Sequence, residues 1–197
     1  ALTTPGALGG EGADKKAAVA LAMNHFGVSE ADLKKVLAAA LEKGGDYADL
    51  FFEHTITNSI RLMDGAVNNS YSNIDYGVGV RVLIGDQSGY AYVENITVED
   101  MLKAARTAAR IASANKGNKP LNLTEKELKK NYYTVASPWE EVSLKDKMPY
   151  LQKLNDRIFA LDKRVHKVQA SQSDTTSHNI FCNSDGLMFY DYRTMVT

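Results

Sequence analysis

The chain has 197 residues, of which 44% are hydrophobic and 24% charged, as in ordinary globular proteins. The formal net charge is −1, from 23 basic and 24 acidic residues, so the sequence lacks the basic excess of a nucleic-acid binder. Cys182 is the only cysteine, which excludes an intrachain disulfide and a metal site built from several cysteines. No apolar run approaches the ~20 residues of a membrane-spanning helix. We therefore expect a globular chain with no membrane span and no nucleic-acid partner.

Residues 1–28 are predicted to form an amino-terminal tail and a short helix. The first ten residues are small, apolar and uncharged, and the sequence does not begin with Met. This composition fits the remnant of an export signal, which would place the protein outside the cytoplasm, and it also fits a flexible tail. The alanine-rich stretch from Asp14 to Phe26 predicts a helix that ends at Gly27.

Residues 29–115 are predicted to form an α+β domain that begins and ends with a helix. Ser29 and Asp32 have the spacing of a helix cap, and apolar residues then recur at helical spacing as far as Leu41. Thr97 opens another helix, whose buried face consists mostly of small residues. We expect both helices to pack on one face of an antiparallel sheet.

The stretch between these helices is rich in aromatic and β-branched residues, which favours strands. Asp64-Gly65 and the loop 85–89 are turn signals, and the pattern predicts four strands between the two helices, at 55–63, 66–71, 78–84 and 90–93. Gly77 and Gly79 lie inside a strand pattern and no helix follows them, so a phosphate-binding loop is not expected there. Such glycines are typical of a bulge or of a place where another backbone comes close.

Residues 116–142 read as a linker, and residues 143–197 as a second, smaller and incomplete α+β unit. A helix is expected from Ser143 or Asp146, and the later start is favoured because it leaves Pro149 in the first turn. Its expected buried stripe comprises Leu151, Leu154, Ile158 and Leu161. Strands are predicted over 164–173, 177–183 and 187–196, with a turn at residues 185–186. The strand pattern still runs where the sequence stops, which suggests a truncated piece of a longer protein.

No catalytic constellation is apparent among the residues. The four histidines are His25, His54, His166 and His178, and no two of them have the helical i, i+4 spacing of a His-Glu-x-x-His zinc motif. We expect each histidine to be solvated or hydrogen-bonded rather than bound to a metal. Cys182 lies in an apolar strand pattern and is expected to be a small buried side chain, not a nucleophile.

Several strings nevertheless resemble the TldD/PmbA family, in the right order from about Ser29 to the end. They include Tyr-Ala-Asp-Leu-Phe-Phe-Glu at 47–53, Asn-Ile-Asp-Tyr-Gly-Val-Gly-Val-Arg at 73–81 and Ser-Asp-Gly at 184–186. The second string resembles the TldD branch more than the PmbA (TldE) branch. TldD-type members are zinc metallopeptidases, once described as modulators of DNA gyrase, which pair with a TldE/PmbA-type subunit and degrade unfolded peptides.

The resemblance implies that this chain is the amino-terminal region of a cytoplasmic, TldD-like zinc metallopeptidase. In that family the zinc ligands lie in a carboxy-terminal domain that this sequence does not include, so no cofactor is expected in this chain. Its implied role is non-catalytic: to associate with a TldE/PmbA-type subunit or with itself, or to offer a strand edge to an unfolded peptide. A non-catalytic TldE-type subunit and a DNA gyrase modulator stay open as alternatives, although the charge balance counts against DNA.

Tyr71, Asp75 and Arg81 are our candidates for peptide or partner contacts, because they are polar or amphipathic residues in or beside the best-matched string. Maintenance of the fold is the alternative role for each of them. No catalytic or metal-binding residue is predicted in this chain.

Overall fold

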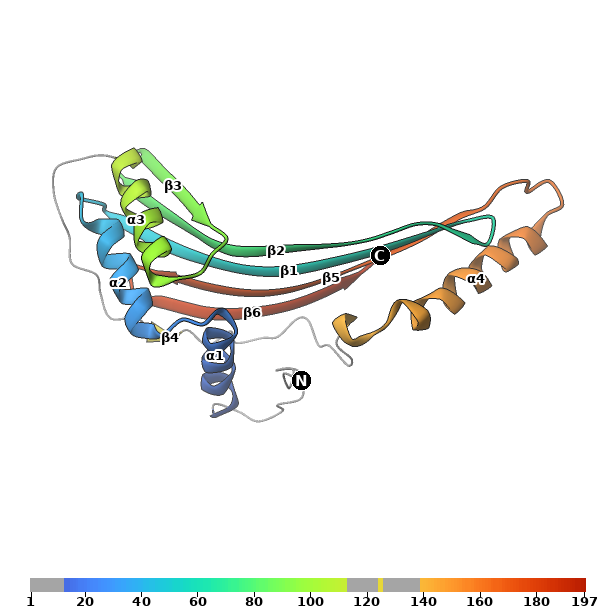
Figure 1. The fold of residues 1–197 in the computed structure, drawn as a ribbon, viewed down its shortest axis with the longest axis horizontal. Coiled ribbons are helices and arrows are strands. Elements are labelled where there is room, and N and C mark those ends of the chain that lie inside the picture. The colour runs from blue at the N-terminus through green and yellow to red at the C-terminus, as the bar shows by residue number, and fades with distance from the viewer. Residues whose placement is uncertain (1–12, 113–123, 126–138) are drawn as a thin grey trace.

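The structure, a computed structural model, describes residues 13–112, 124–125 and 139–197. Its centre is a six-stranded sheet in the order β3-β2-β1-β5-β6-β4, with long strands that run side by side (Figure 1). The strands are β1 (Tyr47–Met63), β2 (Ala66–Ile84), β3 (Gln87–Val93), β4 (Thr124–Glu125), β5 (Gln169–Asn183) and β6 (Leu187–Val196). All pairs are antiparallel except the two-residue pairing of β4 with β6.

Within the part of the chain that the structure describes, four α-helices and one short 3-10 helix accompany the sheet. They are α1 (Ala13–Phe26), α2 (Glu30–Leu41), α3 (Val98–Ala112), η2 (Trp139–Glu141) and α4 (Leu144–Leu161). The predicted α+β class is confirmed. Ser29 and Asp32 form a capping box at the start of α2, and Gly27 ends α1 in the left-handed conformation that glycine adopts freely.

The main core lies where α1, α2 and α3 meet one face of the sheet. Alternation along β1 places the even-numbered residues on this face, among them Leu50 and Phe52, which are fully buried. Val80 of β2 and Ile180 of β5 join them. Both helices that flank the first strands therefore cover the same face, as predicted.

Three strands, rather than the predicted four, follow α2. Ala66–Ile84 is a single strand, because β1 pairs with nearly every residue of it. The backbone groups of the polar residues near its middle are therefore hydrogen-bonded within the sheet, and the strand continues through them. The predicted close approach of another backbone is confirmed at Gly77, where a Cβ would lie 2.6 Å from the carbonyl oxygen of Val93.

The strands of the carboxy-terminal part join the same sheet. β5 pairs with β1 over the whole of its length, from Gln169 opposite Met63 to Asn183 opposite Asp49. The structure thus merges the strands predicted at 164–173 and 177–183 into one, which begins five residues later than expected. The turn at residues 185–186 and the last strand are confirmed.

Helix α4 corrects two expectations. Its cap is Ser143, whose side chain accepts a hydrogen bond from the Asp146 amide, so Pro149 lies inside the helix instead of in its first turn. The predicted buried stripe is wrong at Leu154 and Leu161, which are 47% and 81% exposed, while Ile158 is half-buried. The helix instead buries the row Lys147, Leu151 and Asn155, because the Lys147 ammonium bonds a carboxylate on the sheet.

None of the helices in the described residues is both long and apolar enough to cross a membrane. The predicted amino-terminal remnant at 1–10 and most of the predicted linker at 116–142 lie outside the described residues.

Candidate functional site

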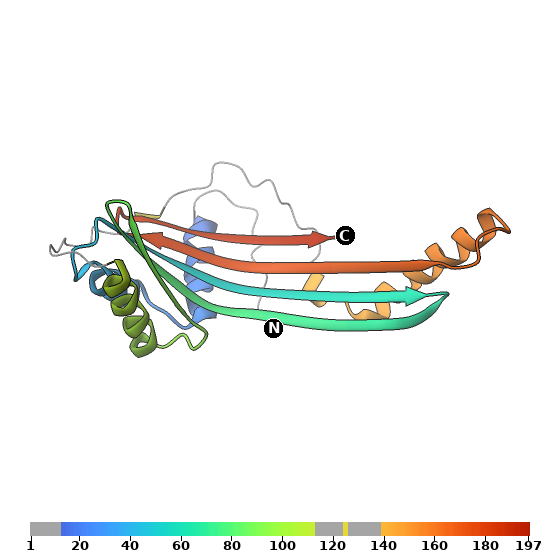
Figure 2. The same cartoon turned by 90° about the horizontal axis from the view of Figure 1, so that it is seen from above.

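The outer edge of β2 is open along more than half of the strand. β3 covers only Val78–Ile84, and no strand of the described residues pairs with the other side of residues 66–77. Figure 2 shows this edge running past the end of β3. Every residue from 66 to 76 is exposed. An unpaired strand edge presents a row of free N–H and C=O groups that another extended chain can bond.

Tyr71, Asp75 and Arg81 all lie on β2 at odd-numbered positions, on the face that the helices do not cover. Tyr71 is 55% exposed, and Asp75 accepts a hydrogen bond from the Asn73 side chain at 3.1 Å. Both belong to the open edge. Arg81 lies beyond it, where β3 pairs with β2, and its guanidinium bonds the Asp49 carboxylate at 2.5 Å. The structure thus brings two of the three predicted residues to the open edge and places Arg81 in an ion pair with Asp49, outside that edge.

A row of aromatic and imidazole rings crosses the sheet on the other face. The register sets Tyr76 of β2 opposite His54 of β1, His54 opposite His178 of β5, and His178 opposite Tyr192 of β6. The last turn of α1 places His25 against this row, with ring centroids 4.8 Å from His54 and 5.0 Å from His178. Three of the four histidines therefore meet at one place, which the sequence did not reveal.

Hydrogen bonds link these rings to one another and to η2. His25 Nε2 lies 2.6 Å from His54 Nδ1, and His178 Nδ1 lies 2.7 Å from the Tyr190 hydroxyl. The Glu140 carboxylate is 3.9 Å from His178 Nε2 and accepts a hydrogen bond from the Tyr192 hydroxyl. The expectation that histidines are hydrogen-bonded is confirmed for these three.

Burial changes the acid–base properties of the row. Loss of hydration lowers the pKa of His178 to about 4, and the nearby His25 acts in the same direction, while Glu140 opposes them. Burial also lowers the pKa of His25 and of His54 below the usual value near 6.5. The imidazoles are therefore neutral at pH 7. Burial raises the pKa of the Tyr190 and Tyr192 hydroxyls.

A buried ion pair lies beyond the histidines on the same face. Lys147 Nζ is 2.6 Å from Asp174 Oδ1, and the two side chains are 5% and 3% exposed. The Asn58 amide donates to the other carboxylate oxygen at 3.0 Å, and the Trp139 ring lies 5.7 Å from the ammonium. A cavity of about 360 Å³ adjoins the pair between the strands and the start of α4.

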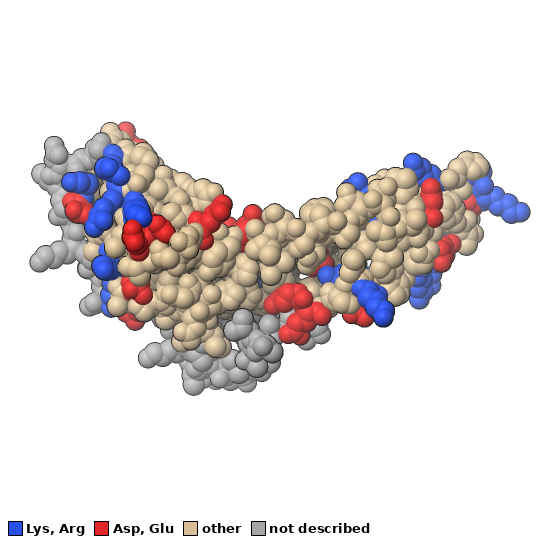
Figure 3. Space-filling view, in the orientation of Figure 1, with Lys and Arg blue, Asp and Glu red and all other residues tan. Residues whose placement is uncertain are grey.

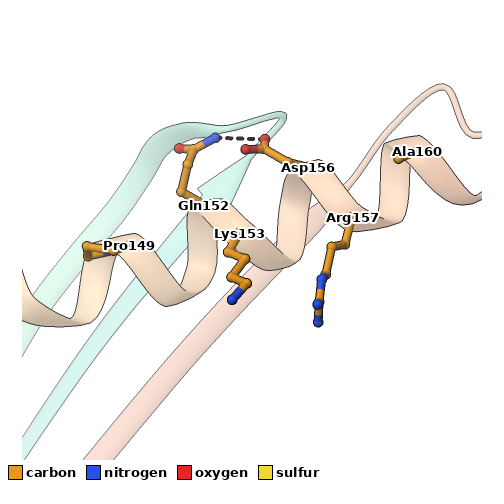
Figure 4. A pocket seen from close by; sticks show the side chains of 6 residues that line it. All are labelled: Pro149, Gln152, Lys153, Asp156, Arg157 and Ala160. Atoms are coloured by element: carbon orange, nitrogen blue, oxygen red, sulfur yellow. Dashed lines mark hydrogen bonds between the residues drawn. The ribbon is translucent and has the colours of Figure 1, made fainter.

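A second hollow, of about 490 Å³, lies against α4, and the described residues that line it all belong to that helix. In Figure 4 the Lys153 and Arg157 side chains extend from one side of the helix, and on the opposite side Gln152 bonds Asp156 at 3.1 Å. On the face shown in Figure 3, basic side chains gather at the two ends of the molecule with acidic ones among them, and further acidic side chains lie near its middle. No continuous basic surface spans this face.

Comparisons with known proteins place the sequence in a family. Residues 48–112 match the model of PmbA/TldA metallopeptidase domain 1, and residues 137–197 match the PmbA/TldA metallopeptidase central domain. Together the two matches span more than half of the chain. The chain belongs to the PmbA/TldD family.

Curated relatives and solved structures agree with this assignment. The metalloprotease TldD homologue of Haemophilus influenzae is 30% identical over 77% of this chain, and that of Buchnera aphidicola from Acyrthosiphon pisum is 26% identical over 88%. The matches cover 32% and 36% of these relatives, so the chain spans about a third of their length.

Two solved structures share the fold of this PmbA/TldD chain. A candidate modulator of a DNA gyrase from Thermotoga maritima has a TM-score of 0.63 at 21% identity, over 85% of this chain and 38% of the other. TldE from Thermococcus kodakarensis has a TM-score of 0.59 at 18% identity, over 84% and 37%.

A metallopeptidase family implies a metal, but the described residues offer no set of three or more ligands that fits one. The histidine row is not a metal site, because the 2.6 Å between His25 Nε2 and His54 Nδ1 is the distance of a hydrogen bond. Two nitrogens bound to one tetrahedral zinc lie ~3.4 Å apart, given zinc–nitrogen bonds of ~2.1 Å. Cys182 is fully buried, as predicted, and its surroundings raise the pKa of the thiol to about 12.

Proposed function

We propose that this chain is the amino-terminal part of a TldD-type zinc metallopeptidase, which degrades unfolded peptides together with a TldE/PmbA-type subunit. The two domain matches in order, and the TldD relatives, support this assignment. In this proposal the zinc ligands lie outside the 197 residues, and the chain positions peptide or partner without cutting it. The family resemblance also favours action in the cytoplasm.

The observation that carries the proposed role is the open edge of β2. An unfolded peptide is already extended, so it can add to residues 66–77 as a further strand and bond the free backbone groups. Apolar side chains along the edge would contact the peptide: Val67, Tyr71, Ile74 and Tyr76, which are 51%, 55%, 60% and 36% exposed. A long apolar edge left bare favours aggregation, so a natural occupant is expected for it.

The test is to place a charge on the edge. Ile74→Lys keeps an exposed position exposed, and we expect it to weaken binding of a labelled unfolded peptide about tenfold, measured by fluorescence anisotropy. Tyr71→Ala should weaken it less. Tyr150→Lys is the matched control, because Tyr150 is an exposed aromatic residue, 76% exposed, that belongs to α4 and not to β2. Equal peptide binding by the Ile74 and Tyr150 variants would show that the open edge of β2 does not bind the peptide.

The zinc assignment needs a separate measurement. The full-length gene product is expected to hold zinc and to cleave an unfolded peptide, whereas this chain alone is expected to do neither. A full-length protein without bound metal would overturn the enzyme assignment but not the peptide-binding edge.

A non-catalytic TldE-type subunit is the second candidate, and the structural likeness to a TldE favours it. The downstream codons decide between the two: a His-Glu-x-x-x-His sequence supports the peptidase, and its absence supports the subunit. A DNA-binding role would require a salt-dependent shift of duplex DNA, which a net charge of −1 makes unexpected.

A further inference from the structure

Helix α1 packs on the sheet beside the histidine row. Its described core residues are Val19, Ala22 and Phe26, and the Phe26 ring lies against Phe52. His25 follows directly, in the last turn, and faces the imidazoles of two strands. The attachment of α1 therefore combines a few apolar contacts with three titratable rings.

We propose that His25, His54 and His178 form a pH-sensitive latch, which holds α1 on the sheet while the imidazoles are neutral and releases the helix when they become protonated.

The bond between His25 and His54 is the centre of the latch. An N–H···N bond needs one ring nitrogen that donates and one that accepts, and an imidazolium has no acceptor. At 2.6 Å the two rings can share one proton but cannot both be fully protonated. Protonation of both would replace the bond by two facing cations, with ring centroids 4.8 Å apart.

His178 adds a third ring at the same place. Its centroid lies 5.0 Å from that of His25 and 6.2 Å from that of His54. Two protonated imidazoles in this row therefore repel a third. As more of the rings become protonated, the docked position of α1 becomes less favourable. His25 is the member that can move away, because the other two lie within long strands.

Other groups face the row from every packed element. Tyr76 of β2 and Tyr190 and Tyr192 of β6 are neutral hydroxyls at pH 5 to 8, with pKa values that burial raises. Glu140 of η2 stabilises a proton on His178, and the carboxyl end of α1 stabilises one on His25. These groups stabilise one protonated imidazole, but they cannot offset the mutual repulsion of three.

The direction of the pH effect follows from the lowered pKa values. Released imidazoles return toward a pKa near 6.5, so between about pH 6.5 and pH 4 the released state binds more protons than the docked state. Docking is therefore complete above that window and is lost as the pH falls through it. From pH 7.5 to pH 5.0, we expect the docking equilibrium to weaken about tenfold or more.

Hydrogen–deuterium exchange of the whole chain tests this. After correction for the intrinsic rates, α1 amides should lose about tenfold protection between pH 7.5 and 5.0, while α2 amides keep theirs. His25→Gln retains a hydrogen-bonding side chain without a titratable group and should abolish most of this change. His166→Gln is the matched control, because His166 is exposed and lies outside the row.

A second measurement covers the case in which His25→Gln frees α1 at every pH. Imidazole proton resonances of the unmodified chain should show three histidines that titrate below the ordinary range around pH 6.5. The latch is refuted if all the histidines titrate in the ordinary range, or if α1 and α2 keep equal protection at pH 5.0.

Discussion

Removal of the Lys147 ammonium should destabilise the fold more than removal of any exposed lysine. Lys147→Met keeps most of the side-chain length and the contacts of its stem but leaves the Asp174 carboxylate 3% exposed without its cation. Asn58 would then be the only hydrogen-bond donor that the described residues give it. An uncompensated buried charge is costly because neither water nor an opposite charge stabilises it.

The magnitude follows from the burial of both partners. Breaking a buried pair by removing one side typically costs about 3–5 kcal/mol. Lys34 provides the matched control, since it too forms an ion pair from a helix, with Glu30 at 2.7 Å, but the two side chains are 39% and 46% exposed. Exposed pairs at this spacing contribute only about 0.3–0.5 kcal/mol, so Lys34→Met should have a small effect.

Urea unfolding, followed by far-ultraviolet circular dichroism, measures both free energies of unfolding. A double variant, Lys147→Met with Asp174→Asn, should recover part of the loss, because it removes the stranded charge and keeps an amide near Asn58. If Lys147→Met costs no more than Lys34→Met, the Lys147–Asp174 pair is not a buried ion pair in solution, which would refute this prediction.

Three further changes test the packing. Gly89→Ala should cost about 2–3 kcal/mol in a thermal melt, because its Cβ would overlap the Ala108 carbonyl oxygen of α3; a loss below ~1 kcal/mol would contradict the close contact of β3 with α3. Ser143→Ala should cost about 1 kcal/mol in urea unfolding, since it removes the cap of α4, and an unchanged midpoint would argue for a helix that starts later. Cys182 should resist a disulfide reagent at pH 8 until the chain is denatured, because its thiol is buried with a pKa raised to about 12, and rapid labelling of the native chain would show otherwise.

The sequence predicts the local elements of this fold well, because their signals are local. The capping box at Ser29, the turn at Asp64-Gly65 and the last strand all depend on neighbouring residues. The length of β2 was missed for a different reason. Polar residues such as Asn73 look like a break, yet a strand whose neighbour satisfies its backbone tolerates them where the side chains face water.

The candidate sites depend on pairings that no local pattern contains. His54 and His178 are 124 residues apart, and only the β1–β5 register makes them neighbours. Side chains alternate along a strand, and His54 and His178 have the same parity as the core residues of their strands. The sequence could therefore have predicted that each lies on the helix-facing side. The row could then have been predicted from the sequence if the pairing partner of β1 had been known. The prediction of the buried residues of α4 was wrong for a similar reason, because the burial of Lys147 depends on a carboxylate elsewhere in the chain.

Three different interactions fix the register of β5 against β1. Ile180 packs in the apolar core, and the His178 ring lies opposite that of His54. Asp174 accepts a hydrogen bond from the Asn58 amide and forms an ion pair with Lys147. A slip of one residue would turn every one of these side chains to the opposite face. Apolar burial alone would specify the register near α2 and α3 and, through Leu62 and Ala170 beneath α4, at the other end of the strands, whereas the middle of the strands is polar. The imidazole row and the ion pair therefore specify the register of the part of the sheet between the two apolar clusters, where polar side chains such as Asp174 are buried.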